Sequence, residues 1–134
     1  CSSDLNFSFN FDSAAGIIYT VDVTKPKGEK VTIISMADGT PFSMDKMYKV
    51  ALNSYRGNGG GELLTKGAGI PQDELKGRIL FSTDKDLRYY LMQYIEKKGV
   101  IEPHALGQWK FIPEEWVEPA AKRDYEYLFG KVEK

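Results

Sequence analysis

Hydrophobic and polar residues follow strand-like patterns in the first third of the chain. Three phenylalanines alternate with polar residues over 7–11, the period of two expected for a half-buried strand. Residues 15–24 and 30–36 are then rich in β-branched side chains. The turn residues Lys-Pro-Lys-Gly at 25–28 separate these two stretches. The pattern therefore predicts a half-buried strand followed by a β-hairpin.

Shorter strand-like stretches occur later in the chain. Residues 48–53 (YKVALN) predict a third strand after the Asp38-Gly39 turn, and residues 79–81 and 108–112 predict two more. A glycine-rich stretch, GNGGG, follows the predicted strand 48–53 at 57–61.

The clearest helical pattern spans residues 83–98. Thr83 can cap this helix, acidic residues lie in its first turn and lysines in its last, and Gly99 can end it. Its apolar residues recur at helical spacing, namely Leu87, Tyr90, Leu91, Tyr94 and Ile95. A second, shorter amphipathic helix is predicted over 119–129. Hairpins combined with one main helix at about 84–98, packed on an antiparallel or mixed sheet, predict an α+β fold.

Length and charge limit the classes of function. A chain of 134 residues predicts a single domain over 1–134. With 18 basic and 19 acidic residues the net charge is −1, so no basic surplus is available to track a nucleic-acid polymer. No apolar run approaches the roughly 20 residues that a membrane span needs, so none is expected.

Cys1 is the only cysteine, so an internal disulfide is excluded. Two interpretations of this residue stay open. It could be the lipid-acceptor cysteine of a mature bacterial lipoprotein, or the chain could simply begin there as a fragment.

The residues that could carry catalysis are sparse. His104 is the only histidine, and metal sites for phosphate-ester chemistry need several converging ligands. Glu114 and Glu115 are expected in a proline-flanked loop before Trp116, as a solvated surface pair rather than an acid–base pair. No G-x-S-x-G nucleophile motif is present. We therefore expect no catalytic residue in this chain.

The glycine-rich stretch is the strongest binding candidate. It matches neither the G-x-x-x-x-G-K-[ST] nor the G-x-G-x-x-G phosphate-binding pattern. The predicted strand before it would bring Tyr55 and Arg56 into a loop whose glycines allow a ligand to approach the backbone closely. Tyr55 could then stack on a flat base, and Arg56 could bind phosphate or ribose oxygens. The competing interpretation is a mobile loop with a capping tyrosine and a solvated arginine.

Six motifs in register resemble one protein family, the C-terminal domain of the 5'-nucleotidase and 2',3'-cyclic-nucleotide 2'-phosphodiesterase family. The resemblance covers about 15–113, and Asn53-Ser54-Tyr55-Arg56 looks closer to the cyclic phosphodiesterase branch. The motifs are Gly16-Ile17 through Asp22, Lys25–Gly28, the strand opening at Val31, Asp38-Gly39, Tyr48–Ala51 and Asn58–Gly60. The helix after Thr83 and the strand at Trp109 also fall where the family has them.

The resemblance implies a nucleotide- or nucleoside-binding role. In this family a separate metallophosphoesterase domain, with two divalent metal ions, hydrolyses the ester, whereas the C-terminal domain holds the base between two aromatic rings. One ring matches Tyr55, and the other comes from a segment preceding Gly16 that we do not place. The implied substrate-binding residues are Asn53, Tyr55, Arg56, Asn58, Gly59, Gly60 and Gly61. No cofactor is expected in this chain, and the family commonly works outside the cytoplasm, in nucleotide breakdown.

Two features depart from the family pattern. Many members carry an aspartate that contacts the ribose, where this chain has Gly61 followed by Glu62. The chain also matches only the later part of the family's domain, so we expect it to be incomplete at its N-terminal side.

These departures favour two alternatives to nucleotide recognition. The first is a non-catalytic interaction module that has lost nucleotide binding. The second is a fragment, whose Trp109, Phe111 and Trp116 would be partly exposed and which would self-associate, for example as a dimer.

Overall fold

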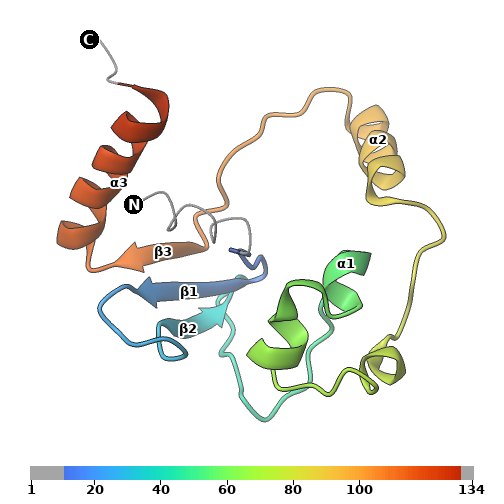
Figure 1. Ribbon diagram of the computed structural model, residues 1–134. Coiled ribbons are helices and arrows are strands. Elements are labelled where there is room, and N and C mark those ends of the chain that lie inside the picture. Colours follow the sequence, from blue (N-terminus) through green and yellow to red (C-terminus); the bar gives the residue numbers. More distant parts are fainter. Residues whose placement is uncertain (1–10, 131–134) are drawn as a thin grey trace. The chain divides into compact units, whose positions relative to one another are not determined.

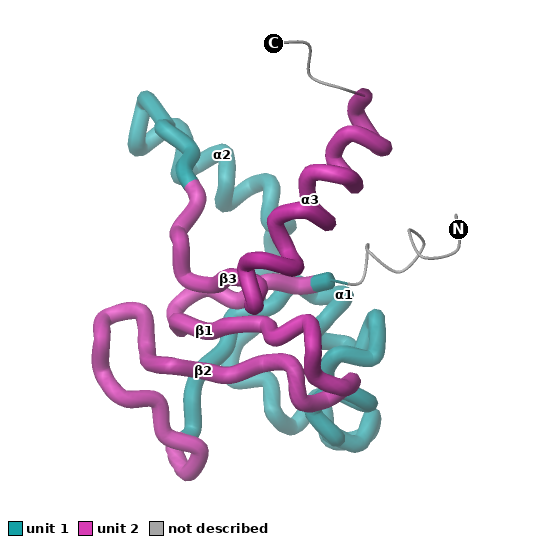
Figure 2. The backbone as a smooth tube through the Cα atoms, turned by 90° about the vertical axis from the view of Figure 1, so that its left-hand side faces the viewer, with its two compact units in different colours: residues 1–11, 47–104 teal, residues 12–46, 105–134 magenta. Residues whose placement is uncertain are grey.

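The computed structural model describes residues 11–130 and divides the chain into two compact units (Figures 1 and 2). Unit 1 comprises residues 1–11 and 47–104, and unit 2 comprises residues 12–46 and 105–134. The prediction of one domain over 1–134 stays a prediction. Cys1 and most of the predicted strand at 7–11 lie outside the described residues.

Unit 2 is built on a three-stranded sheet. Its strands are β1 (Ile17–Asp22), β2 (Val31–Met36) and β3 (Trp109–Ile112), in the order β2-β1-β3. β1 pairs antiparallel with β2, which confirms the predicted hairpin, and pairs parallel with β3, which confirms the predicted strand at 108–112. The sheet is therefore mixed.

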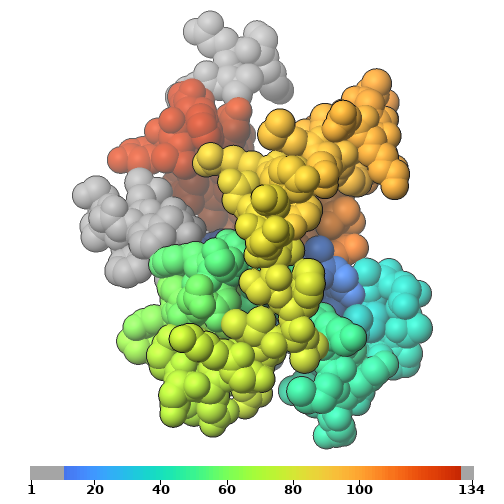
Figure 3. Space-filling view, turned by 90° about the vertical axis from the view of Figure 1, so that its right-hand side faces the viewer, coloured from blue at the N-terminus to red at the C-terminus, as the bar shows by residue number. Residues whose placement is uncertain are grey.

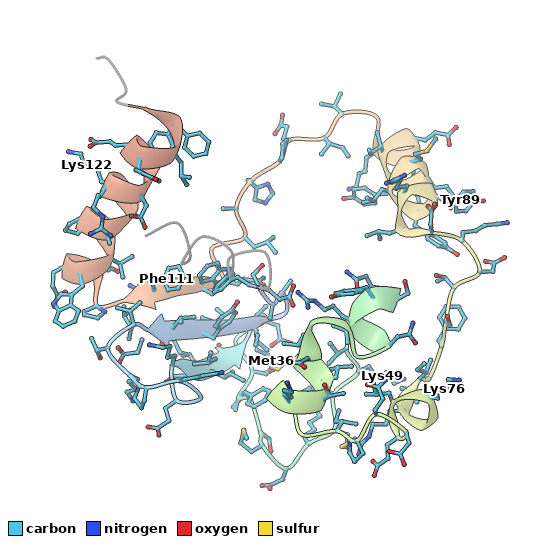
Figure 4. All side chains as sticks on the ribbon, viewed as in Figure 1. Met36, Lys49, Lys76, Tyr89, Phe111 and Lys122 are labelled. Carbon is cyan, nitrogen blue, oxygen red and sulfur yellow. The ribbon has the colours of Figure 1, made fainter. Side chains whose placement is uncertain are left out.

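Aromatic side chains form the small core of this sheet. Tyr19 and Val21 are its buried apolar residues, because alternate residues of the central strand face the same side. The ring of Tyr19 stacks on that of Trp109 of the neighbouring strand, with centroids 5.9 Å apart. Trp109 in turn meets Phe111, labelled in Figure 4, edge to face at 5.1 Å. Such pairs add to the stabilisation from burial.

Helix α3 (Glu114–Phe129) follows β3 in unit 2 and contacts it. The predicted helix at 119–129 is confirmed, but it begins five positions earlier, after Pro113 as N-cap. Glu114 and Glu115 therefore lie in the first helical turn, where the helix dipole favours negative charge, and the prediction that they lie in a loop is wrong. The Lys110 ammonium donates to Glu114 and lowers the pKa of that carboxyl.

Unit 1 contains helical segments and no strand among its described residues. These are α1 (Ser54–Gly57), the single turns η2 (Gly60–Glu62), η3 (Leu63–Gly67) and η4 (Leu75–Arg78), and α2 (Leu87–Lys98). The predicted strands at 48–53 and 79–81 are wrong. Both stretches have strand propensity, but the described residues of unit 1 contain no strand with which they could pair. A single strand is unfavourable because its backbone N–H and C=O groups would lack hydrogen-bond partners.

Helix α2 starts three residues later than predicted. Its N-cap is Asp86, whose Oδ1 accepts from the Tyr89 amide at 3.0 Å, while the Thr83 hydroxyl donates to the Lys85 carbonyl instead. The predicted end at Gly99 is confirmed.

The predicted apolar face of α2 is solvent-exposed throughout, and the helix lies on the surface of its unit (Figure 3). Because α2 and the sheet belong to different units, the packing of this helix on the sheet stays a prediction. The α+β class is confirmed. Among residues 11–130 no helix is long and apolar enough to cross a membrane.

Candidate functional site

The predicted binding residues of unit 1 lie on a one-turn helix and the loop after it. Asn53 is the N-cap of α1, and its Oδ1 accepts from the Arg56 amide at 2.8 Å. Asparagine suits this position because its short side chain can reach an amide that the first helical turn leaves unpaired. Tyr55 and Arg56 are thus presented by a helical turn, and the prediction that a strand delivers them is wrong.

Arg56 is buried, with 8% of its surface exposed. Its Nη1 donates to the carbonyl of Gly60 at 3.2 Å, and its guanidinium carbon lies 5.4 Å from the centroid of the Tyr55 ring. A buried guanidinium needs such partners because desolvating it alone is costly. Arg56 therefore braces the glycine-rich loop, and the interpretation of a solvated arginine is wrong.

The glycine-rich loop follows a path that few other residues could take. Gly59 and Gly61 have φ values of +92° and +67°, in the left-handed region that favours glycine. At Gly60 the constraint is steric, because a Cβ there would lie 2.5 Å from Cε2 of Tyr55. The loop backbone consequently lies directly against the edge of the tyrosine ring.

Tyr55 is 62% exposed although it touches the loop and Arg56. Because Gly60 and the guanidinium contact it from within unit 1, the ring is supported in one position. An exposed, supported aromatic ring is the geometry that a stacked planar ligand requires.

Glu62 is already engaged in an ion pair. Its Oε1 lies 2.7 Å from Nζ of Lys66, on the exposed surface of unit 1. Its φ of +60° is unusual for a residue with a side chain. Glu62 is thus held at the end of the loop, next to Gly61, and the family resemblance predicts a ribose-binding aspartate at the position of Gly61.

Sequence reasoning missed two residues that contact the loop from a later segment. Nε2 of Gln72 donates to the carbonyl of Asn58 at 3.0 Å. Leu75 is 5% exposed, and its Cδ1 lies 3.1 Å from where a Cβ of Gly59 would be. No local pattern marks either residue, because the contacts join positions about 14 to 16 residues apart.

Other candidate chemistry is weak over the described residues. His104 is an exposed loop residue whose Nδ1 lies 3.1 Å from the Glu102 carbonyl oxygen. Within residues 11–130 no group of three or more histidine, cysteine, aspartate or glutamate side chains could hold a metal ion. Unit 2 has a pocket of about 390 Å³, lined by residues 13–15 and 105–109, which contains none of the predicted binding residues.

Comparison with known proteins places this loop in a family. Residues 3–66 match the family model described as 5'-nucleotidase, C-terminal domain. This stretch is shorter than the predicted 15–113 at its C-terminal end, but it includes every predicted binding residue. The chain is therefore related to the C-terminal domain of 5'-nucleotidases, as its motifs predicted.

Two curated relatives carry phosphoesterase names. One is the trifunctional nucleotide phosphoesterase protein YfkN of Bacillus subtilis, 31% identical over 117 residues, covering 79% of this chain and 8% of the relative. The other is a 2',3'-cyclic-nucleotide 2'-phosphodiesterase/3'-nucleotidase of Haemophilus influenzae, 26% identical over 121 residues, covering 79% of this chain and 17% of the relative. The chain thus spans less than a fifth of either relative. No solved structure matches it.

Proposed function

We propose that this chain is a nucleotide- or nucleoside-recognition module that works with a metallophosphoesterase domain or subunit. That partner would supply the divalent metals and hydrolyse the phosphate ester in nucleotide breakdown. The observation that carries the proposal is the exposed Tyr55 ring, held against Gly60 and Arg56 within a stretch that matches the 5'-nucleotidase C-terminal domain.

Each part of the loop has a role in this proposal. The Tyr55 ring stacks on the base, an interaction worth about 1–3 kcal/mol in other settings. The backbone of Asn58, Gly59, Gly60 and Gly61 lines the ribose side, where the absence of side chains allows close approach. Asn53 and Arg56 hold the helical turn and the loop in place through their hydrogen bonds.

The proposed setting is outside the cytoplasm, in the periplasm or at the cell surface. This setting rests on the family resemblance.

Titration with adenosine, AMP and 3'-AMP, by calorimetry or ligand-observed NMR, tests the proposal. Tyr55→Ala should weaken adenosine binding about 5- to 150-fold, the equivalent of one lost stacking interaction, whereas Tyr55→Phe keeps the ring and should bind almost normally. Tyr94→Ala is the matched control, because Tyr94 is also half-exposed and beside a cation, Lys98, on α2. Equal adenosine affinities of the Tyr55→Ala and Tyr94→Ala variants would contradict the assignment of Tyr55 as the base-stacking residue.

A non-catalytic interaction module is the second candidate. It is favoured by Gly61 in place of the ribose-binding aspartate, and by the ion pair that holds Glu62 to Lys66. The exposed apolar face of α2 would then be a docking surface. Absence of nucleoside binding at millimolar concentration would favour this candidate.

A further inference from the structure

We propose that Gln72 is a positioning residue that clamps the glycine-rich loop in the conformation that supports nucleoside binding. The inference rests on the proposed function for its ligand, but the clamp itself can be observed without any ligand. Gln72 lies beyond residues 3–66, the stretch that matches the family model, so the family match does not assign it a role.

The hydrogen bond from Gln72 holds the loop at Asn58, the residue that follows α1. Its Nε2 donates to the carbonyl of Asn58 at 3.0 Å, while its Oε1 lies 2.5 Å from where a Cβ of Gly59 would be. The side-chain amide therefore lies along the backbone of two successive loop residues. Only a glycine at the second of these positions leaves room for it in this orientation.

A tight turn presents Gln72 together with a hydrophobic anchor. The Glu74 amide donates to the Pro71 carbonyl at 3.0 Å, which closes a turn around Gln72. Leu75 follows directly and is the one apolar side chain that is buried among the described residues of unit 1. Because Leu75 also contacts Gly59, its burial fixes the distance from which Gln72 reaches the loop.

The loop needs such a clamp because glycine has the largest backbone freedom of any residue. Binding to a disordered loop would have to order it first, which weakens affinity. Gln72 holds the loop at Asn58, the residue that directly follows α1, and Arg56 holds it farther along the glycine run, at Gly60. Together they fix the loop segment that lies against the Tyr55 ring.

Three variants of the full chain separate the clamp from general effects of substitution. Gln72→Met keeps the length of the side chain but removes the donor. Gln72→Lys keeps a donor able to reach the Asn58 carbonyl. Gln93→Met is the matched control, because Nε2 of Gln93 also donates at 3.0 Å, but to the Tyr89 hydroxyl on α2.

The first measurement is amide hydrogen exchange in the ligand-free chain. The Gly59 and Glu62 amides donate to the carbonyls of Arg56 and Gly59, so their exchange reports whether the loop stays closed. Gln72→Met should accelerate exchange at both amides by about three- to tenfold, the effect of losing one ordinary hydrogen bond, whereas Gln72→Lys and Gln93→Met should not. If the Gly59 and Glu62 amides of Gln72→Met exchange at the same rate as in the unmodified chain, Gln72 does not clamp the loop.

The second measurement is adenosine affinity in the same variants. Gln72→Met should weaken it by about three- to tenfold, and Gln72→Lys should restore most of it. If Gln72→Met accelerates amide exchange in the loop but leaves adenosine affinity unaltered, Gln72 is not a positioning residue for binding. If the unmodified chain does not bind adenosine, the proposed function fails, and the exchange comparison still decides whether Gln72 clamps the loop.

Discussion

Two glycines of the stretch 57–61 show how differently one residue type can be constrained. Gly57 lies inside α1, and a Cβ added there would meet nothing within 4 Å. Gly60 would place a Cβ 2.5 Å from the Tyr55 ring and 2.6 Å from the Tyr55 carbonyl oxygen. The sequence presents both as equal members of a glycine run, and only the position of the tyrosine distinguishes them.

Alanine substitutions should separate these two glycines. Gly60→Ala must displace the ring and backbone of Tyr55, so we expect a loss of about 1–3 kcal/mol in stability together with weaker adenosine binding. Gly57→Ala should be neutral or stabilising by up to about 1 kcal/mol, because alanine favours a helix. Thermal unfolding and calorimetric titration measure both effects. Equal behaviour of the two variants would contradict the proximity of Gly60 to the ring.

At the scale of elements, two similar turns end the strands of the hairpin. Oδ1 of Asp22, the last residue of β1, accepts from the Thr24 hydroxyl at 2.6 Å and from the Thr24 amide at 3.0 Å. Asp38, after β2, makes the same pair of bonds with Thr40 at 2.6 and 2.9 Å. These bonds lower the pKa of both carboxyls, because they stabilise the ionised form.

The lowered pKa values predict a pH dependence of hairpin stability. A carboxyl whose pKa is lower in the folded state stabilises that state above its unfolded pKa of about 3.9, and the contribution is lost as the pH falls through the lowered value. Thr24→Val and Thr40→Val remove the hydroxyl and keep the amide, so each should raise the pKa of its aspartate part of the way back. NMR titration of the carboxyl carbons measures this, with Thr32→Val as control. An unshifted titration would show that the hydroxyl contributes nothing.

The strand prediction at 48–53 failed for a physical reason. Tyr48, Val50 and Leu52 recur at every second position, but no strand of unit 1 is available to pair with them among the described residues. The local signal at the end of this stretch was a helix cap, since Asn53 begins α1. Likewise, Pro113 followed by two glutamates marked the true start of α3, where charge favours the helix N-terminus.

At the scale of the whole molecule, the proposed function assigns hydrolysis to a partner domain or subunit. Within 11–130 no cluster of potential metal ligands occurs, and the chain covers 8% and 17% of its two phosphoesterase relatives. Two-metal phosphoesterase chemistry needs several converging carboxylate or imidazole ligands. Under the proposed function, such ligands belong to a domain or subunit other than the recognition module.

The chain alone should therefore not release phosphate from 3'-AMP or open 2',3'-cyclic AMP with added Mg²⁺, Mn²⁺, Co²⁺ or Zn²⁺. Phosphate release and product chromatography measure this. A Tyr55→Ala sample prepared identically is the control, since a contaminating phosphatase would be equally active in both samples. Metal-dependent turnover that falls in Tyr55→Ala would show that this chain carries the chemistry itself.

The sequence by itself determined the hairpin, the last strand, the α+β class and the resemblance to the 5'-nucleotidase C-terminal domain, because these depend on local periodicity, turn residues and motifs. Only the tertiary structure decided that Arg56 is buried against Gly60, and that Gln72 and Leu75 hold the loop. Likewise, only the structure showed that β3 pairs with β1 in parallel. These features depend on contacts between residues that are not neighbours along the chain. Local propensity and periodicity carry no information about such contacts.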